Sequence, residues 1–285
     1  MTLDRSLLDS LVETALTAGQ VVMEVYAGDF AVTTKGDASP VTAADERAEK
    51  VILADLARLL PGVPVVAEEE AAAGRLPTNL GDRFVLVDPL DGTREFVSRN
   101  GEFTVNIAVV DAGKPIAGVV LAPALGEIFV GALGAGARAG RIDAEGRIVW
   151  RDIAVRTPSA DGLGVLASRS HAGPETEELL ARLAVARRVS AGSSLKFCRV
   201  AAGEADLYPR LGRTMEWDTA AGDVVLRAAG GAVVGLDGRP LLYGKRNQAN
   251  DVDFANPWFL AGGSAATLSA AVAAAAGLAV PSGRG

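Results

Sequence analysis

The sequence predicts a mixed α/β protein, organised as an α+β layered sandwich. Helical periodicity and short apolar, strand-like runs alternate along almost the whole chain, which is typical of layered architectures. The length of 285 residues and the hydrophobic content of 49% allow a large buried core. A polar, turn-rich segment at 141–161 predicts a junction between two domains, residues 1–150 and residues 151–285.

Composition argues against several classes of function. A net charge of −7 argues against a general binder of nucleic acids or anionic membranes. The single cysteine, Cys198, rules out an internal disulfide framework and is typical of a reducing compartment. No leader pattern opens the chain, and no stretch is long and apolar enough to span a bilayer. We therefore expect a cytoplasmic protein, with peripheral association at the inner membrane left open.

Two helices are expected near the N-terminus. Apolar residues at helical spacing predict the first over residues 7–26. The second should open at Thr42 and run to about Leu60, where a Pro-Gly pair stops it. Thr42 and Asp45 match a capping box, in which side chains satisfy the free N–H groups at a helix start. From this local pattern alone, capping is favoured over a catalytic role for Asp45.

Two predicted strands end in acidic residues. The strand at 63–67 leads directly into Glu68. A second, buried strand at 84–87 should be ended by Asp88 and Pro89, because proline cannot donate to a ladder. If the two strands are neighbours in one sheet, Glu68 lies beside Asp88.

The short segment after the second strand is rich in oxygen ligands. Asp88 and Asp91 stand so close that they repel each other unless something positive lies between them. Mg²⁺ is suited to that place, since it prefers a few carboxylates plus water. The alternative is a polar strand-to-helix turn with Thr93 as the N-cap of a short helix. The segment by itself leaves both explanations open.

The rest of the chain predicts a run of strands followed by alternating elements. Antiparallel hairpin strands are expected at 103–110, 116–121 and 128–132. Helices are expected at 174–188, 195–202 and 219–229, and at the Ala-rich end of the chain. Short strands are expected at 165–167, 206–208, 232–236 and 259–261. Asp218 stands just before a predicted helix, where Asp is a preferred N-cap.

Four of these stretches resemble, in the expected order, the signatures of the magnesium-dependent, lithium-sensitive phosphatases related to inositol monophosphatase. They are Pro40–Asp45, Glu68–Glu69, Asp88–Thr93 and Trp217–Gly222. The resemblance covers essentially the whole chain, and the combination is specific although each block alone is weak. Further stretches are similar to one branch of that family, the bacterial 3'(2'),5'-bisphosphate nucleotidases: Arg94–Asn106, Ala167–His171, Gly192–Cys198 and Leu207–Arg210.

This resemblance implies a sugar-phosphatase-like αβαβα architecture and two or three Mg²⁺ ions per site. The implied metal ligands are Glu68, Asp88, the carbonyl group of Leu90, Asp91 and Asp218. Thr93 and Asp45 would orient and deprotonate the attacking water. The domain at 1–150 would then carry most metal ligands, and the domain at 151–285 would carry Asp218 and the substrate-binding stretches.

The resemblance also implies which residues meet the substrate. Those around the hydrolysed phosphate are Glu68, Asp91, Gly92, Thr93 and Asp218. Those that contact the rest of a nucleotide are Ser168, His171, Gly192 and Lys196. Among these, His171 would lie against the adenine-ribose portion and Lys196 would meet a phosphate.

The implied activity is hydrolysis of the 3'-phosphate of adenosine 3',5'-bisphosphate to AMP. The expected partner is a small phosphorylated substrate, and neither nucleic acid nor an integral membrane segment is expected. Two alternatives stay open: an inositol or sugar monophosphatase of the same family, and a non-catalytic nucleotide- or metal-binding protein that has kept the fold. The residues leave open whether the chain is a monomer or a homodimer.

Overall fold

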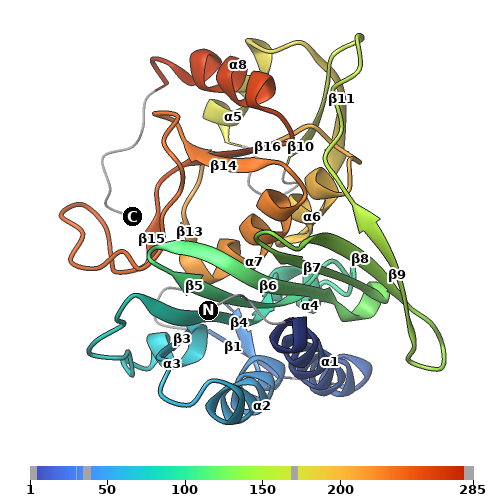
Figure 1. Cartoon of the computed structure of the whole chain (residues 1–285), viewed down its shortest axis with the longest axis vertical. Coiled ribbons are helices and arrows are strands. Elements are labelled where there is room, and N and C mark those ends of the chain that lie inside the picture. The colour runs from blue at the N-terminus through green and yellow to red at the C-terminus, as the bar shows by residue number, and fades with distance from the viewer. Residues whose placement is uncertain (1–4, 30, 35–39, 168–172, 279–285) are drawn as a thin grey trace.

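Figure 1 shows the computed structural model, which describes residues 5–29, 31–34, 40–167 and 173–278. Its layers stack in the order helices, sheet, helices, sheet, helices. The predicted layered α/β fold with αβαβα order is therefore confirmed. None of the helices in the described ranges combines the length and the apolar character needed to cross a bilayer.

The larger sheet has seven strands in sequence order. They are β3 (Val65–Ala67), β4 (Arg83–Asp91), β5 (Thr104–Asp111), β6 (Lys114–Ala122), β7 (Glu127–Ala132), β8 (Gly136–Ile142) and β9 (Ile148–Ile153). β3 and β4 pair in parallel, and the remaining neighbours pair antiparallel. One face of this sheet is covered by α1 (Arg5–Ala27) and α2 (Ala43–Leu59), and a ribbon of β1 (Val32–Thr34) and β2 (Pro40–Thr42) precedes α2.

The smaller sheet has the strand order β11-β10-β12-β16-β14. Its strands are β10 (Leu163–Ala167), β11 (Val185–Ser190), β12 (Leu207–Arg210), β14 (Ala232–Gly235) and β16 (Phe259–Gly262). α5 (Pro174–Ala181) and α8 (Ala265–Ala275) lie on its outer side, and α6 (Leu195–Ala201) and α7 (Glu216–Ala228) lie between the two sheets. A short ribbon of β13 (Thr214–Met215) and β15 (Ala255–Asn256) adjoins the start of α7.

The larger sheet is buried on both faces, and the alternation along β5 shows how. Val105, Ile107 and Val109 pack in the core that contains α1 and α2. Ala108 and Val110 point the other way, into the core shared with α7. A strand buried on both faces appears in the sequence as a nearly continuous apolar run, and β5 was predictable although Thr104 and Asn106 interrupt it.

Two glycines let α7 lie close against this sheet. A Cβ atom at Gly131 of β7 would come within 2.6 Å of the Val225 Cα atom. A Cβ atom at Gly118 of β6 would come within 2.7 Å of a Val224 methyl group. Any larger residue would push the helix outward, because protein interiors have no spare volume. The glycines therefore fix how near α7 lies to the sheet.

The structure corrects the predicted end of the second acidic strand. β4 does not stop at Asp88 but continues to Asp91 through a β-bulge. Asp88 pairs with Asn106 and Asp91 pairs with Thr104, so the chain between them carries one residue more than its partner strand. Proline is tolerated at such a bulge, since the regular ladder is interrupted there anyway.

One further prediction of local structure is wrong, and another is incomplete. The helix expected at 174–188 ends at Ala181, because residues 185–190 form β11 and pair in parallel with β10. The segment at 141–161 is not only a junction, since it contains β9 at the edge of the larger sheet. A domain boundary near residue 150 stays a prediction.

Candidate active site

A cavity of about 280 Å³ opens where the end of β4 faces α6, α7 and β12. Six of the lining residues were predicted to belong to the site: Glu68, Asp91, Gly92, Thr93, Lys196 and Asp218. The lining also includes nine without an assigned role: Arg94, Glu95, Ser193, Ser194, Phe197, Tyr208, Arg210, Thr214 and Thr219. Residues from both halves of the chain thus meet in one cavity.

The carboxylates of Glu68, Asp91 and Asp218 line this cavity, and the charge of buried Asp88 interacts with all three. We call these four residues the acid wall. The parallel register of β3 and β4 pairs Ala67 with Val87, which makes Glu68 and Asp88 neighbours, as predicted. Burial raises the pKa of Asp88 well above its usual range, and the charges of the other three carboxylates raise it further. Burial also raises the pKa of Asp218, with Asp91 and Glu68 adding to the effect. The acid wall is therefore self-repelling and would be stabilised by a cation.

The chain itself holds two members of the acid wall in place. Asp88 is almost fully buried, and its Oδ1 atom accepts a hydrogen bond from the Leu90 N–H group at 3.0 Å. The Oδ2 atom of Asp91 accepts hydrogen bonds from Ser193 Oγ, from the Ser194 N–H group at 2.7 Å and from Ser194 Oγ at 2.9 Å. The sequence analysis missed the two serines, which no local pattern connects to a strand some hundred residues earlier.

Glu68 is positioned from a neighbouring helix. It begins the short helix α3 (Glu68–Ala72), for which Ala67 provides no side-chain cap. The carboxylate of Glu49 on α2 accepts hydrogen bonds from the N–H groups of Glu69 at 2.8 Å and Glu70 at 2.9 Å. Burial raises the pKa of Glu49 to about 7, although these two hydrogen bonds oppose the rise. Glu49 thus caps α3 from outside it, a role that sequence analysis did not anticipate.

Asp218 lies in the first turn of α7 and is not its N-cap, so the capping alternative for Asp218 is wrong. Its Oδ2 atom accepts a hydrogen bond from the Met215 N–H group at 2.8 Å, and Met215 is the N-cap. Among the described residues, no three His, Cys, Asp or Glu side chains lie close enough together to hold a metal ion as they stand. The donor set nevertheless fits a hard cation, since it consists of oxygen ligands that repel one another without one.

Thr93 and Asp45 meet beside the acid wall. Thr93 is the first residue of α4 (Thr93–Val97), and the N-cap is Gly92 with φ at 89°, so the N-cap hypothesis for Thr93 is wrong. Its Oγ1 atom lies 3.4 Å from Asp45 Oδ1 and 3.4 Å from the Leu90 carbonyl oxygen. The other oxygen of Asp45 accepts hydrogen bonds from the Thr42 N–H and hydroxyl groups, each at 2.8 Å, which confirms the capping box. Asp45 therefore caps α2 and faces Thr93 at the same time.

Two cationic side chains also line the cavity, and we call Lys196 and Arg210 the basic wall. Lys196 is 5% exposed, its Nζ atom donates to the Ala191 carbonyl at 3.2 Å, and burial lowers its pKa to about 8. Arg210 donates to the Arg213 carbonyl at 3.1 Å, but its buried Nε atom has no hydrogen-bond partner among the described residues. A buried guanidinium nitrogen without a partner fits an anion in the cavity.

The signal for Arg210 was present in the sequence. Tyr208 and Arg210 are two positions apart on β12, so their side chains share one face of the strand. Tyr208 lies beneath Lys196, with the Nζ atom 5.4 Å from the ring centroid. Sequence analysis noted the block at 207–210 but gave Arg210 no role.

The remaining predicted substrate contacts are less well defined. Gly192 packs against Glu102, where a Cβ atom would come within 2.6 Å of the Glu102 carbonyl oxygen. That close approach is one reason for a glycine there, and its contact with substrate stays a prediction. Ser168 and His171 lie outside the described residues, so their proposed nucleotide contacts are also predictions.

Comparisons with known proteins show which family the chain belongs to. The inositol monophosphatase family matches residues 4–273 of the chain. The 3'(2'),5'-bisphosphate nucleotidase CysQ of Escherichia coli strain K12 is 46% identical over 255 residues, which cover 89% of this chain and 98% of that protein. The protein of the same name from Salmonella typhimurium is 44% identical over the same share of each chain.

Solved structures lead to the same family. The crystal structure of CysQ from Bacteroides thetaiotaomicron, a bacterial member of the inositol monophosphatase family, matches with a TM-score of 0.73 and 35% identity, covering 92% of this chain and 99% of that one. The structure of inositol monophosphatase from Anabaena matches with a TM-score of 0.74 and 26% identity, covering 98% of both chains. The similarity therefore extends over the whole fold.

Proposed function

This chain belongs to the inositol monophosphatase family, and from that premise we propose that it is a magnesium-dependent 3'(2'),5'-bisphosphate nucleotidase. The reaction is hydrolysis of the 3'-phosphate of adenosine 3',5'-bisphosphate to AMP and phosphate. The observation that carries the proposal is the cavity with two walls of opposite charge. A ligand with a metal-bound phosphate at one end and a second phosphate at the other suits both walls.

The acid wall and the Leu90 carbonyl group are the proposed metal ligands. We assign two or three Mg²⁺ ions to Glu68, Asp88, Leu90, Asp91 and Asp218. The raised pKa values of Asp88 and Asp218 support this assignment, because they reflect burial and, in addition, repulsion by the neighbouring carboxylates. Bound magnesium would supply positive charge that offsets both the carboxylates and the phosphate dianion.

Thr93 and Asp45 are the proposed route for the proton of the attacking water. The Thr93 hydroxyl group lies between the cavity and Asp45 Oδ1, so it can accept a proton from water while it donates to the carboxylate. The capping box holds the other Asp45 oxygen and so keeps Oδ1 directed at Thr93. Direct attack by water needs no covalent intermediate with the protein.

The basic wall is the proposed site for the phosphate that is not hydrolysed. Lys196 carries a charge at neutral pH, since its pKa is about 8, and Arg210 offers a buried N–H group that lacks a partner. Charge-assisted hydrogen bonds to phosphate are among the stronger polar contacts in proteins. A monoester without a second phosphate would leave both cations unsatisfied, which favours a bisphosphate over a simple sugar phosphate.

A substrate panel tests the proposal. Phosphate release is measured with magnesium for adenosine 3',5'-bisphosphate, inositol 1-phosphate, fructose 1,6-bisphosphate and AMP. We expect the highest kcat/KM for adenosine 3',5'-bisphosphate and little activity on AMP. A preference for inositol 1-phosphate would assign the chain to the monophosphatases of the family. Binding of the bisphosphate without turnover would indicate a non-catalytic protein. A cytoplasmic location and the oligomeric state stay predictions.

A further inference from the structure

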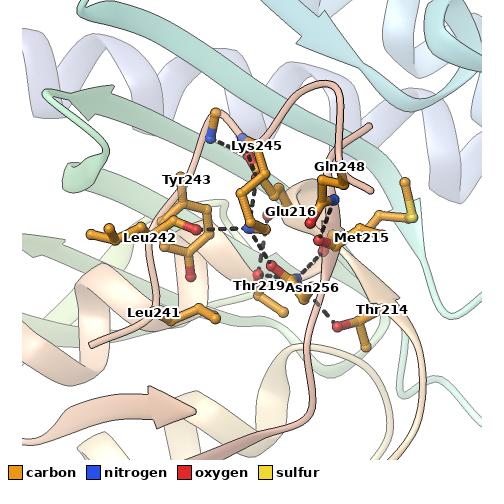
Figure 2. A network of polar contacts seen from close by, with 12 residues as sticks. Thr214, Met215, Glu216, Thr219, Leu241, Leu242, Tyr243, Lys245, Gln248 and Asn256 are labelled. Carbon is orange, nitrogen blue, oxygen red and sulfur yellow. Dashed lines mark hydrogen bonds and ion pairs between the residues drawn. The ribbon is translucent and has the colours of Figure 1, made fainter. Parts of the chain in front are cut away.

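A buried polar network behind the acid wall has no part in the chemistry proposed above. Its centre is Glu216, the first residue of α7, which is fully buried and two residues before Asp218. One carboxylate oxygen of Glu216 accepts a hydrogen bond from the Gly244 N–H group at 2.6 Å, and the other from the Lys245 N–H group at 2.9 Å. The Lys245 ammonium lies 2.7 Å from the second oxygen (Figure 2). Both carboxylate oxygens of Glu216 thus bind the start of α7 to the segment that contains Gly244 and Lys245.

We call that segment, residues 241–256, the tie segment. It begins after β14 and ends in β15, and Figure 2 shows Lys245 and Asn256 of this segment beside the start of α7. At its far end Asn256 Nδ2 lies 3.2 Å from Thr214 Oγ1, 2.8 Å from the Met215 carbonyl oxygen and 3.0 Å from Thr219 Oγ1. Thr214 and Thr219 both line the cavity. Asn256 therefore orients two hydroxyl groups of the cavity wall.

Lys245 links the contacts at Glu216 to the contacts at Asn256. Its Nζ atom contacts Glu216 at 2.7 Å, donates to Asn256 Oδ1 at 3.1 Å and donates to the Leu242 carbonyl at 2.7 Å. An ammonium group has three hydrogens, and each of them has an acceptor here. Lys245 thus links the Glu216 carboxylate at the start of α7 to the Asn256 side chain, which contacts the cavity wall.

The tie segment also contacts the first half of the chain. Arg246 donates to the carbonyl groups of Pro77 at 2.9 Å and Thr78 at 3.2 Å, in the loop that follows α3. The Tyr243 N–H group donates to the Gly113 carbonyl at 3.0 Å, in the hairpin between β5 and β6. One segment is therefore bonded to the helix that carries Asp218 and to the loop of the helix that begins with Glu68.

From these contacts we infer that Glu216, Lys245 and Asn256 are positioning residues, which set the first turn of α7 against the rest of the acid wall. This inference rests on the proposed metal site. Hydrogen bonds to a buried carboxylate fix direction as well as distance, which apolar packing does not. Loss of the fastening would let Asp218 and Thr219 shift together, so that metal affinity falls while the ligands themselves remain.

A contact that only stabilises the fold should leave metal affinity unchanged, and the chain offers a matched control of this kind. Tyr243 belongs to the same tie segment, and its hydroxyl group donates to buried Asp223 at 2.9 Å. Asp223 lies on α7 five residues beyond Asp218, away from the cavity lining. Tyr243→Phe removes one buried hydrogen bond between the same two elements, so it should lower thermal stability and leave metal affinity unchanged.

The experiment measures Mn²⁺ binding by electron paramagnetic resonance, without any phosphate ester, next to the thermal unfolding temperature. We expect Glu216→Gln to raise the Mn²⁺ dissociation constant about 10–100-fold, the usual effect of losing a group that supports a metal ligand. Lys245→Met keeps both backbone donors to Glu216 and should have a smaller effect in the same direction, which Lys245→Arg partly restores. If Glu216→Gln does not fold, the Mn²⁺ affinity of Lys245→Met tests the inference.

Three outcomes overturn the inference. One is a folded Glu216→Gln or Lys245→Met variant with the Mn²⁺ affinity of the wild type. Another is Tyr243→Phe weakening Mn²⁺ as much as Glu216→Gln, which would trace the effect to general stability. The third is a wild-type chain that binds no Mn²⁺, which overturns the proposed metal site as well. A wild type that binds Mn²⁺ but rejects adenosine 3',5'-bisphosphate contradicts only the assigned substrate.

Discussion

The acid wall and the basic wall face the same cavity, yet they are supported in different ways. Each carboxylate of Asp88, Asp91 and Asp218 accepts at least one hydrogen bond from a nearby backbone N–H group. The basic wall has looser support: Lys196 donates to one carbonyl group, and Arg210 keeps a buried Nε atom without a partner among the described residues. Burial disfavours the charged form on both sides, since it raises the pKa of Asp88 and lowers that of Lys196.

This difference suits the two walls to two separate functions, cation binding and recognition of a second phosphate. A wall of rigidly held carboxylates presents the same oxygen ligands to a cation whatever ester is bound, so its loss should affect every substrate. A wall with unsatisfied donors gains partners only when an anion arrives, so its loss should affect only substrates that carry a second phosphate. The predictions below test that separation, from the largest expected effect to the smallest.

The largest effect is expected for Asp91→Asn. The change removes a charge from the acid wall, so phosphate release should fall to background for every ester, and Mg²⁺ binding should weaken strongly. Phosphate-release assays and calorimetric Mg²⁺ titration measure both effects, with circular dichroism as the control for folding. A folded Asp91→Asn protein with full turnover would contradict the proposed metal site.

Thr93→Ala should reduce kcat about 10²–10⁴-fold, the usual share of positioned proton transfer. The Mg²⁺ requirement should change little, because the hydroxyl group that is lost lies 3.4 Å from Asp45 rather than among the acidic ligands. Thr93→Ser keeps the hydroxyl group and should retain most activity. If Thr93→Ala instead loses Mg²⁺ affinity and keeps kcat at saturating Mg²⁺, the role of Thr93 is structural.

Lys196→Ala should separate the two walls most clearly. Losing a charge-assisted hydrogen bond costs roughly 1.5–3 kcal/mol, or about one to two decades in kcat/KM for adenosine 3',5'-bisphosphate. Adenosine 3'-monophosphate has the same reacting phosphate but no second one, so its kcat/KM should hardly change. Arg210→Ala should follow the same pattern.

Equal losses on both substrates would mean that Lys196 supports the fold or the metals. His171→Ala completes the series, since the proposed contact of His171 with adenosine predicts equal losses on the two adenosine substrates and none on a small phosphate ester.

The smallest effect is expected from pH. The ammonium group of Lys196 is charged below its pKa of about 8, which burial lowers from the ordinary value of 10.5. The kcat/KM for adenosine 3',5'-bisphosphate reports the free enzyme, so it should fall as the pH rises above 8 and level off no lower than the value of Lys196→Ala. Lys196→Arg keeps its charge and should remove this descending limb.

The same shift has a defined sign for stability. Between pH 8 and 10.5 the unfolded chain binds more protons at Lys196 than the folded chain, so the free energy of unfolding should rise with pH across that window. Denaturant unfolding of wild type and Lys196→Met at pH 7.5 and pH 9.5 measures it. A pH dependence that is identical in the two proteins would contradict the lowered pKa of Lys196.

Local sequence patterns were sufficient for much of the fold and for part of the site. The helical period at 7–26 and the capping box of Thr42 and Asp45 are confirmed by α1 and α2. The proximity of Glu68 and Asp88 also followed from two strands that end in acids. Such features depend on residues within one or two turns of each other, where side-chain type and spacing decide the conformation.

Predictions from local sequence failed where contacts with a distant part of the chain determine the local structure. Pro89 does not end β4, because pairing with β5 continues beyond it through the bulge. Residues 185–188 are strand and not helix, because β10 offers them a parallel partner. Tertiary hydrogen bonding outweighs local propensity in both places.

By itself, then, the sequence determined helices α1 and α2, the acids at the strand ends and the capping of α2. Only the tertiary structure decided that Ser193 and Ser194 hold Asp91, that Glu49 caps α3 and that Glu216 fastens α7 to the tie segment. The physical reason is separation along the chain. These contacts join residues about 20 to 100 positions apart, and they form because burying the apolar faces of two sheets around α6 and α7 brings distant polar groups within hydrogen-bond distance.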